Sequence, residues 1–185
     1  AALPQLQAAF STPIIGVVIP GAWAAVQVTR NRRVGVMATE ATVRSGAYQR
    51  SLRTLDAGLE IFAQACPRLA PLIQAGDVSS EETEAAAREY VAPLKQVDVD
   101  TVILGCTHYP LITPMLRRLL GPRVSLINSA EETAIEVQAI LDRKGMSNVA
   151  DREGDYRFVC TGDAEEFREV GARFLQLPIR EVTRI

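Results

Sequence analysis

Asp100-Thr-Val-Ile-Leu-Gly105 runs directly into Cys106-Thr-His-Tyr-Pro110, and this is the most informative stretch of the sequence. Its centre, Val102 to Leu104, is uniformly apolar, which is typical of a strand in a parallel sheet that helices cover on both faces. Parallel neighbours are joined by crossover segments, and these are usually helices. The stretch therefore predicts an α/β protein with a buried strand that ends at a cysteine.

Strand-like and helix-like runs alternate on both sides of this stretch. Further strands are expected at Pro13–Ile19, Arg33–Ala38, Gly58–Ala65, Arg123–Ile127, Asp155–Cys160 and Ile179–Thr183. Helices are expected at 1–10, Ala22–Arg30, Thr39–Leu55, Pro114–Leu120, Ser129–Lys144, Glu165–Leu175 and after the capping box Ser79–Glu82. This alternation indicates βαβ units and mostly parallel sheets. Ligands of such sheets bind beyond the carboxyl ends of the strands, so the residues directly after each strand are the candidates for function.

The 185 residues are 48% hydrophobic and 23% charged, with a formal net charge of −2. This composition is too apolar and too evenly charged for a disordered chain, and it offers no basic surface for nucleic acid or an anionic membrane. The longest apolar stretch, Ile14–Val28, is too short and too interrupted by glycine and proline to span a bilayer. Three widely spaced cysteines make no disulfide framework. We expect a soluble, cytoplasmic protein.

The strongest candidate site follows the buried strand, where Cys106 lies two residues from His108, the only histidine of the chain. A thiol beside helix amides and an imidazole is expected to favour its thiolate, which can serve as a base or a nucleophile. Thr107 and the neighbouring amides can hold a carboxylate, because helix N-termini bind anions. The alternative is a buried cysteine and a structural histidine.

A second candidate follows the strand Arg33–Ala38. Thr39 and Thr42 are three residues apart, so their hydroxyls share one face of a first helical turn. Together with free amides they can bind a carboxylate. The alternative is plain N-capping, for which Thr39 is equally suited.

Other chemistry has little support. Cys66 and Cys160 are expected to pack as small hydrophobic side chains, and without a CxxC pair no zinc site is expected. Lys95 and Lys144 are the only lysines, in polar surroundings, which argues against a pyridoxal Schiff base. GxGxxG, Walker A and GxSxG motifs are absent. We therefore expect neither a metal nor a cofactor.

The run Leu104–Pro110 resembles the second cysteine motif of glutamate racemases. The resemblance continues, in order and spacing, in four further segments: Ile14–Ala22, Val36–Val43, Ala65–Pro67 and Val159–Asp163. It covers essentially the whole chain. Related aspartate racemases usually have a glutamate where His108 stands, so the histidine favours glutamate as the substrate.

The resemblance implies an isomerase that interconverts L- and D-glutamate without a cofactor and supplies D-glutamate for peptidoglycan synthesis in the cytoplasm. Two cysteines on opposite faces of the substrate exchange its Cα proton. Cys106 would be one of them, with His108 as a catalytic and binding neighbour and with Thr107, Thr39 and Thr42 binding the substrate. The family fold has two similar α/β domains with the active site between them. The resemblance also allows a homodimer.

Three features depart from the family pattern. The segment with the first catalytic cysteine precedes a helix like residues 1–10, so we expect roughly the first third of a family member to be absent here. Residues 19–132 would then form the second domain, and 1–18 plus 133–185 would be the remnant of the first. Gln74 stands where the family often has glutamate, and Asn128 where it often has aspartate.

Two other functions stay open at this point. A remnant of the fold could bind an amino acid without turnover, or the chain could act on another amino acid of the same superfamily. His108-Tyr109-Pro110 argues against the latter.

Overall fold

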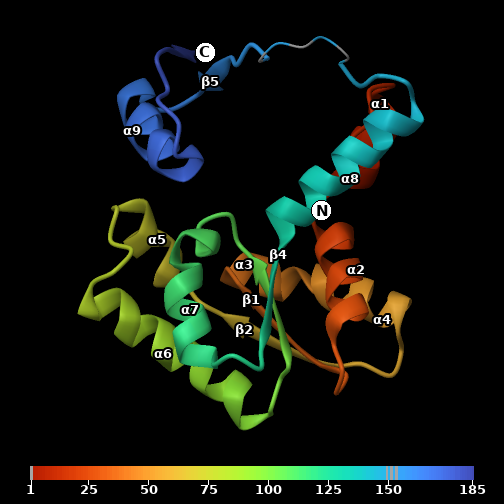
Figure 1. Cartoon of the computed structure of the whole chain (residues 1–185), viewed down its shortest axis with the longest axis vertical. Helices are drawn as coiled ribbons and strands as arrows, with labels where there is room; N and C mark the ends of the chain where they lie inside the picture. Colours follow the sequence, from red (N-terminus) through yellow and green to blue (C-terminus); the bar gives the residue numbers. More distant parts are fainter. Residues whose placement is uncertain (1, 149, 151, 153) are drawn as a thin grey trace. The chain divides into compact units, whose positions relative to one another are not determined.

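The computed structural model describes residues 2–148, 150, 152 and 154–185. These residues divide into two compact units, the first ending at Ser147 and the second beginning at Asn148. The first unit contains nearly all of the elements, in the order drawn in Figure 1. No helix in the described part of the chain combines the length and apolar character needed to cross a membrane.

A four-stranded parallel sheet forms the centre of the first unit. Its strands, in spatial order, are β2 (Glu60–Ala65), β1 (Arg33–Ala38), β3 (Thr101–Gly105) and β4 (Ser125–Asn128). The chain leaves β1 toward β2 on one side and later returns to place β3 on the other. The topological switch point is therefore at the carboxyl ends of the paired strands β1 and β3, where the connections depart in opposite directions and leave room for a ligand. All four strands lie close to the residues predicted for them.

Helices cover both faces of this sheet (Figure 1). On one face, α2 (Val18–Val28) and α4 (Ala47–Leu55) pack against a set of inward-facing strand residues: Val34, Val36, Ala38, Ile103 and Ile127. On the other face, α5 (Leu69–Gln74), α6 (Glu81–Gln96) and α7 (Thr113–Leu120) pack against Met37, Val102 and Leu104. Because both faces are buried, β3 is apolar at every central position, as its sequence predicted.

Two predicted elements are wrong. Pro13–Ile19 forms no strand, and α2 begins instead at Val18 with Pro20 inside its first turn. Proline is tolerated there because amides of the first turn have no partner within the helix. The single helix expected over Thr39–Leu55 is two helices, α3 (Glu40–Ser45) and α4, because Gly46 between them has a positive φ of 63°. Glycine adopts that conformation without steric cost.

The other predicted elements are present with shifted ends, whereas α5 and a 3₁₀ helix over Tyr109–Ile112 were not predicted. α1 spans Leu3–Ala9, and α8 spans Ser129–Arg143 with Asn128 rather than Ser129 as its N-cap. The second unit contains β5 (Phe158–Cys160), α9 (Ala164–Leu175) and β6 (Val182–Arg184), with β5 and β6 parallel. An α/β fold with parallel sheets flanked by helices is confirmed. The domain boundaries expected from the resemblance stay a prediction.

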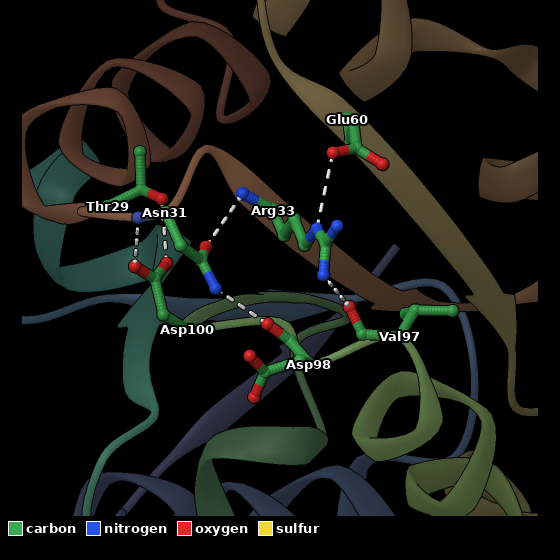
Figure 2. A network of polar contacts seen from close by, with 7 residues as sticks. All are labelled: Thr29, Asn31, Arg33, Glu60, Val97, Asp98 and Asp100. Carbon is green, nitrogen blue, oxygen red and sulfur yellow. Dashed lines mark hydrogen bonds and ion pairs between the residues drawn. The ribbon is translucent and has the colours of Figure 1, made fainter.

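A polar network fixes the amino ends of β1 and β3 (Figure 2). The carboxylate of Asp100 accepts hydrogen bonds from Thr29 Oγ1 at 2.7 Å, from the Arg30 amide at 2.6 Å and from the Asn31 amide at 2.7 Å. Burial alone raises the pKa of Asp100, but these hydrogen bonds outweigh it and hold the pKa below its usual range. The loop after α2 is therefore held against the start of β3.

The same network continues to β2. The Asn31 side chain donates to the Asp98 carbonyl at 2.7 Å and accepts from the Arg33 amide at 2.9 Å, while Arg33 Nε lies 3.2 Å from Glu60 Oε1 (Figure 2). Strand register is thus specified by polar contacts at one edge of the sheet as well as by the core. Because the register is fixed at the amino ends of the strands, it also determines which residues lie next to one another at their carboxyl ends.

Candidate active site

The candidate site lies at the carboxyl edge of the sheet, at the β1–β3 switch point. Ala38, the last residue of β1, is the register partner of Gly105, the last residue of β3. Thr39 and Cys106 therefore leave the sheet from neighbouring, equivalent positions. The structure thus brings the two candidate segments of the sequence to one edge.

Gly105 lies in a closely packed position at this edge. A Cβ added to it would lie 3.0 Å from the Tyr48 ring, 3.2 Å from Ala38 Cβ and 3.3 Å from the Met37 carbonyl oxygen. The Tyr48 hydroxyl is in turn 2.9 Å from Ser129 Oγ, in a buried hydrogen bond between α4 and α8. Tyr48, held by this hydrogen bond, therefore packs against the end of β3 that directly precedes Cys106.

Cys106 is half-buried, with its Sγ 3.8 Å from Nδ1 of His108. Burial raises the pKa of the Cys106 thiol, and it does so despite hydrogen bonds from the His108 and Tyr109 amides, which lower it. The expectation that these amides would favour the thiolate is therefore wrong in its net direction, because desolvation is the larger effect. Burial also lowers the pKa of His108. Both shifts favour a neutral thiol beside a neutral imidazole.

His108 has further polar neighbours on each side of its ring. Its Nδ1 lies 3.4 Å from Oγ1 of Thr107, which is exposed, and its Nε2 lies 2.7 Å from Oε1 of Gln74. Gln74 is the last residue of α5 and is 34 residues away in sequence. The sequence marked Gln74 only as a departure from a family pattern, and its contact with His108 was not predicted.

Thr39 and Thr42 share one face, as their spacing predicted. Their hydroxyl oxygens are 3.0 Å apart, and Thr39 Oγ1 also accepts from the Thr42 amide at 3.4 Å, which makes Thr39 the N-cap of α3. Both side chains are half-buried. The capping interpretation and the paired-hydroxyl interpretation therefore describe the same geometry.

Cys66 follows β2 at the same edge but is fully buried. Burial raises the pKa of its thiol to about 12, and its Sγ lies 3.5 Å from the Gln64 carbonyl oxygen, so it is a thiol packed in the core, as expected. The buried Tyr109 hydroxyl donates to the Cys66 carbonyl at 3.1 Å and ties the loop after β3 to the end of β2. Among the described residues, no group of three or more histidine, cysteine, aspartate or glutamate side chains could hold a metal ion.

Comparisons with known proteins identify the family. The model of the Asp/Glu/Hydantoin racemase family matches residues 1–137. A glutamate racemase from Listeria monocytogenes is 39% identical over 185 residues, which is all of this chain and 70% of that protein. Relatives from Exiguobacterium sibiricum and Bacillus cereus, also glutamate racemases, are 38% and 37% identical.

Solved structures agree with these matches. The crystal structure of a glutamate racemase isoform from Bacillus anthracis superimposes with a TM-score of 0.92 at 39% identity, covering all of this chain and 69% of that one. A glutamate racemase from Francisella tularensis, in complex with D-glutamate, superimposes with a TM-score of 0.87 at 28% identity, covering 97% of this chain and 66% of that one. The carboxyl-edge site thus lies in a chain that belongs to the Asp/Glu/Hydantoin racemase family, as a homologue of glutamate racemases.

Proposed function

We propose that this fold serves the cofactor-independent interconversion of L-glutamate and D-glutamate, with Cys106 as one of the two groups that exchange the Cα proton. The proposal rests on one observation: the half-buried Cys106 Sγ lies 3.8 Å from His108 Nδ1 at the β1–β3 switch point. The Francisella relative with D-glutamate bound supports glutamate as the ligand.

Chemistry at the Cα atom needs an acid and a base on opposite faces. On one face, the Cys106 thiolate accepts the Cα proton and becomes a thiol, leaving a planar carbanion at Cα. On the other face, a second thiol donates its proton to Cα and becomes a thiolate, so that the configuration is inverted. By resemblance, the second thiol belongs to the family segment that precedes the residues matched here. Cys66 is unsuited to that role because it is buried and its pKa is about 12.

His108 and the threonines have complementary roles in this proposal. His108 Nδ1 accepts the thiol proton of Cys106 when the thiolate forms, and the hydroxyls of Thr107, Thr39 and Thr42 bind substrate. Three hydroxyls and the adjacent amides can hold a carboxylate group while the amino acid is desolvated at the site, which makes its Cα proton easier to remove.

The wider assignment follows the resemblance. We propose that the D-glutamate enters peptidoglycan synthesis in the cytoplasm. Residues 19–132 would form one α/β domain, and residues 1–18 with 133–185 would contribute to a second, similar one. The active site would lie between the two domains.

Binding of glutamate without turnover is a second candidate, favoured by one observation. The raised pKa of Cys106 and the lowered pKa of His108 both oppose formation of the thiolate in the chain by itself.

Proton exchange at Cα tests these assignments together. The chain is incubated in D₂O with L-glutamate or D-glutamate, and loss of the Cα–H signal is followed by NMR, with both aspartate enantiomers as controls. Exchange of glutamate but not aspartate supports the proposal. Glutamate binding seen in the protein spectrum without any exchange supports the binding candidate, and exchange of aspartate alone contradicts both assignments.

A further inference from the structure

We propose that Gln74 is a positioning residue of the candidate site, which holds His108 in the tautomer that directs the Nδ1 lone pair toward Cys106. Its meaning for catalysis rests on the proposed function, whereas the geometry itself can be tested without turnover. Gln74, His108 and Cys106 then form one hydrogen-bonded series in the order amide, imidazole, thiol.

The tautomer follows from the contact with Gln74. Gln74 Oε1 lies 2.7 Å from His108 Nε2, and a carbonyl oxygen can only accept a hydrogen bond, so Nε2 carries the proton. A neutral imidazole has a single N–H, which leaves Nδ1 as the acceptor. Cys106 Sγ lies 3.8 Å and Thr107 Oγ1 3.4 Å from Nδ1, and each of these groups can donate to it.

Gln74 and His108 both lie in or next to short helices that are anchored in the core by buried side chains. Gln74 ends α5, in which Leu69 and Ile73 are buried. His108 directly precedes the 3₁₀ helix η1 (Tyr109–Ile112), in which Tyr109 and Ile112 are buried. All four buried residues belong to the same core cluster. The packing of α5 against η1 therefore sets the separation of the two polar side chains.

Gln74 differs from a carboxylate in having no charge. A glutamate at this position would stabilise the imidazolium form of His108 and raise its pKa. With an amide, the resting site is a neutral thiol beside a neutral imidazole. When Cys106 ionises, its S–H bond breaks and an Nδ1–H bond forms, and the resulting imidazolium donates from Nε2 to the Gln74 carbonyl. Amide positioning of an imidazole beside a thiol is also found in Cys-His-Asn proteases.

The single histidine makes a direct test simple. In the full chain labelled with ¹⁵N-histidine and free of any histidine tag, only one imidazole contributes signals. The ¹⁵N shifts are expected to show a protonated Nε2 and an unprotonated Nδ1. Gln74→Glu is expected to raise the pKa of His108 by about 1, and Gln74→Leu is expected to lower it, because the imidazolium loses its acceptor. Backbone amide spectra report whether each variant remains folded.

Gln96→Glu is the matched control. Gln96 is exposed and is the last residue of α6, as Gln74 is of α5, so this variant adds the same charge at a helix end away from the candidate site. It is expected to leave the pKa of His108 unchanged. A protonated Nδ1 in the wild-type chain overturns the proposal. A folded Gln74→Glu variant with the wild-type pKa of His108 also overturns it.

These outcomes do not depend on racemisation. A chain that exchanges no Cα protons but has the expected tautomer and the expected order of pKa values contradicts the proposed function and leaves the positioning role standing. In a chain that does exchange Cα protons, the pH dependence of exchange is expected to move with the His108 pKa in Gln74→Glu but not in Gln96→Glu. An unchanged pH profile in Gln74→Glu overturns the catalytic part of the inference.

Discussion

Ala38 and Gly105 are register partners at the ends of two parallel strands, so the loops that begin at Thr39 and Cys106 start side by side. The pairing places a hydroxyl pair and a thiol–imidazole pair at the same sheet edge. It depends on two kinds of contact, the polar network around Asp100 at the amino ends of the strands and the close packing of Gly105 at their carboxyl ends. Each contact leads to a prediction.

Gly105→Ala is expected to destabilise the first unit by about 1 to 3 kcal/mol, because its Cβ would overlap the Tyr48 ring and crowd the Met37 carbonyl. Urea denaturation followed by far-UV circular dichroism measures the change. Gly162→Ala is the control, since a Cβ there meets nothing within 4 Å. Equal stability of the two variants would show that the approach of Tyr48 to the strand end is not as close as described.

Tyr48→Phe is expected to cost about 1 to 2 kcal/mol, because it leaves the buried Ser129 hydroxyl without its partner. Ser129→Ala in the Tyr48→Phe background is expected to cost less than the sum of the two single changes. A double-mutant cycle in urea measures this coupling. Tyr156→Phe, at an exposed tyrosine in the second unit, is the control for loss of a hydroxyl. Additive costs would contradict the hydrogen bond.

Asp100 contributes stability that depends on pH. Its folded-state pKa is lowered, so the contribution is fully present above the unfolded pKa of about 4 and is lost as pH falls through the folded value. Asp100→Asn is expected to cost about 1 kcal/mol at pH 7 after solvent screening, and less near pH 3. Thermal unfolding at the two pH values measures the difference.

Asp98→Asn is the matched control for that change. The Asp98 carboxylate makes no hydrogen bond or ion pair within the described part of the chain, and asparagine tolerates the positive φ of this residue. A cost at Asp98 equal to that at Asp100, with the same pH dependence, would contradict the network in Figure 2.

The two thiols at the sheet edge are expected to differ in reactivity. Iodoacetamide at pH 8 is expected to label the half-buried Cys106 much faster than Cys66, which is buried and has a pKa of about 12. Because burial raises the pKa of Cys106 as well, its labelling should still increase above pH 8. Peptide mapping by mass spectrometry separates the sites. Labelling of Cys66 at the rate of Cys106 in the folded chain would contradict the burial described.

The sequence predicted the parts of the site that depend on local patterns. An unbroken apolar run identified β3, and a three-residue spacing placed Thr39 and Thr42 on one face. Contacts between distant segments were not predicted. The contacting pairs lie far apart in sequence: 81 residues separate Tyr48 from Ser129, 43 separate Tyr109 from Cys66, and 34 separate His108 from Gln74. No periodicity encodes such pairs, because the packing of helices on the sheet creates them.

The errors have a similar origin. Pro13–Ile19 is rich in β-branched residues, which suggests a strand, but a strand needs a neighbour, and no strand of the first unit's sheet pairs with it among the described residues. At Cys106, the sequence revealed the amide donors and the imidazole but not the depth of burial, and burial determines the direction of the pKa change.

In the proposed reaction, Cys106 exchanges the Cα proton of glutamate. The most direct test compares Cα–H exchange in D₂O for the unaltered chain, Cys106→Ser and Cys66→Ser, with L- and D-glutamate measured separately by NMR. At least one enantiomer is expected to exchange with the unaltered chain and with Cys66→Ser, and the rate is expected to fall about 100-fold or more in Cys106→Ser. Exchange that survives in Cys106→Ser, or that is absent from the unaltered chain, would overturn this role of Cys106.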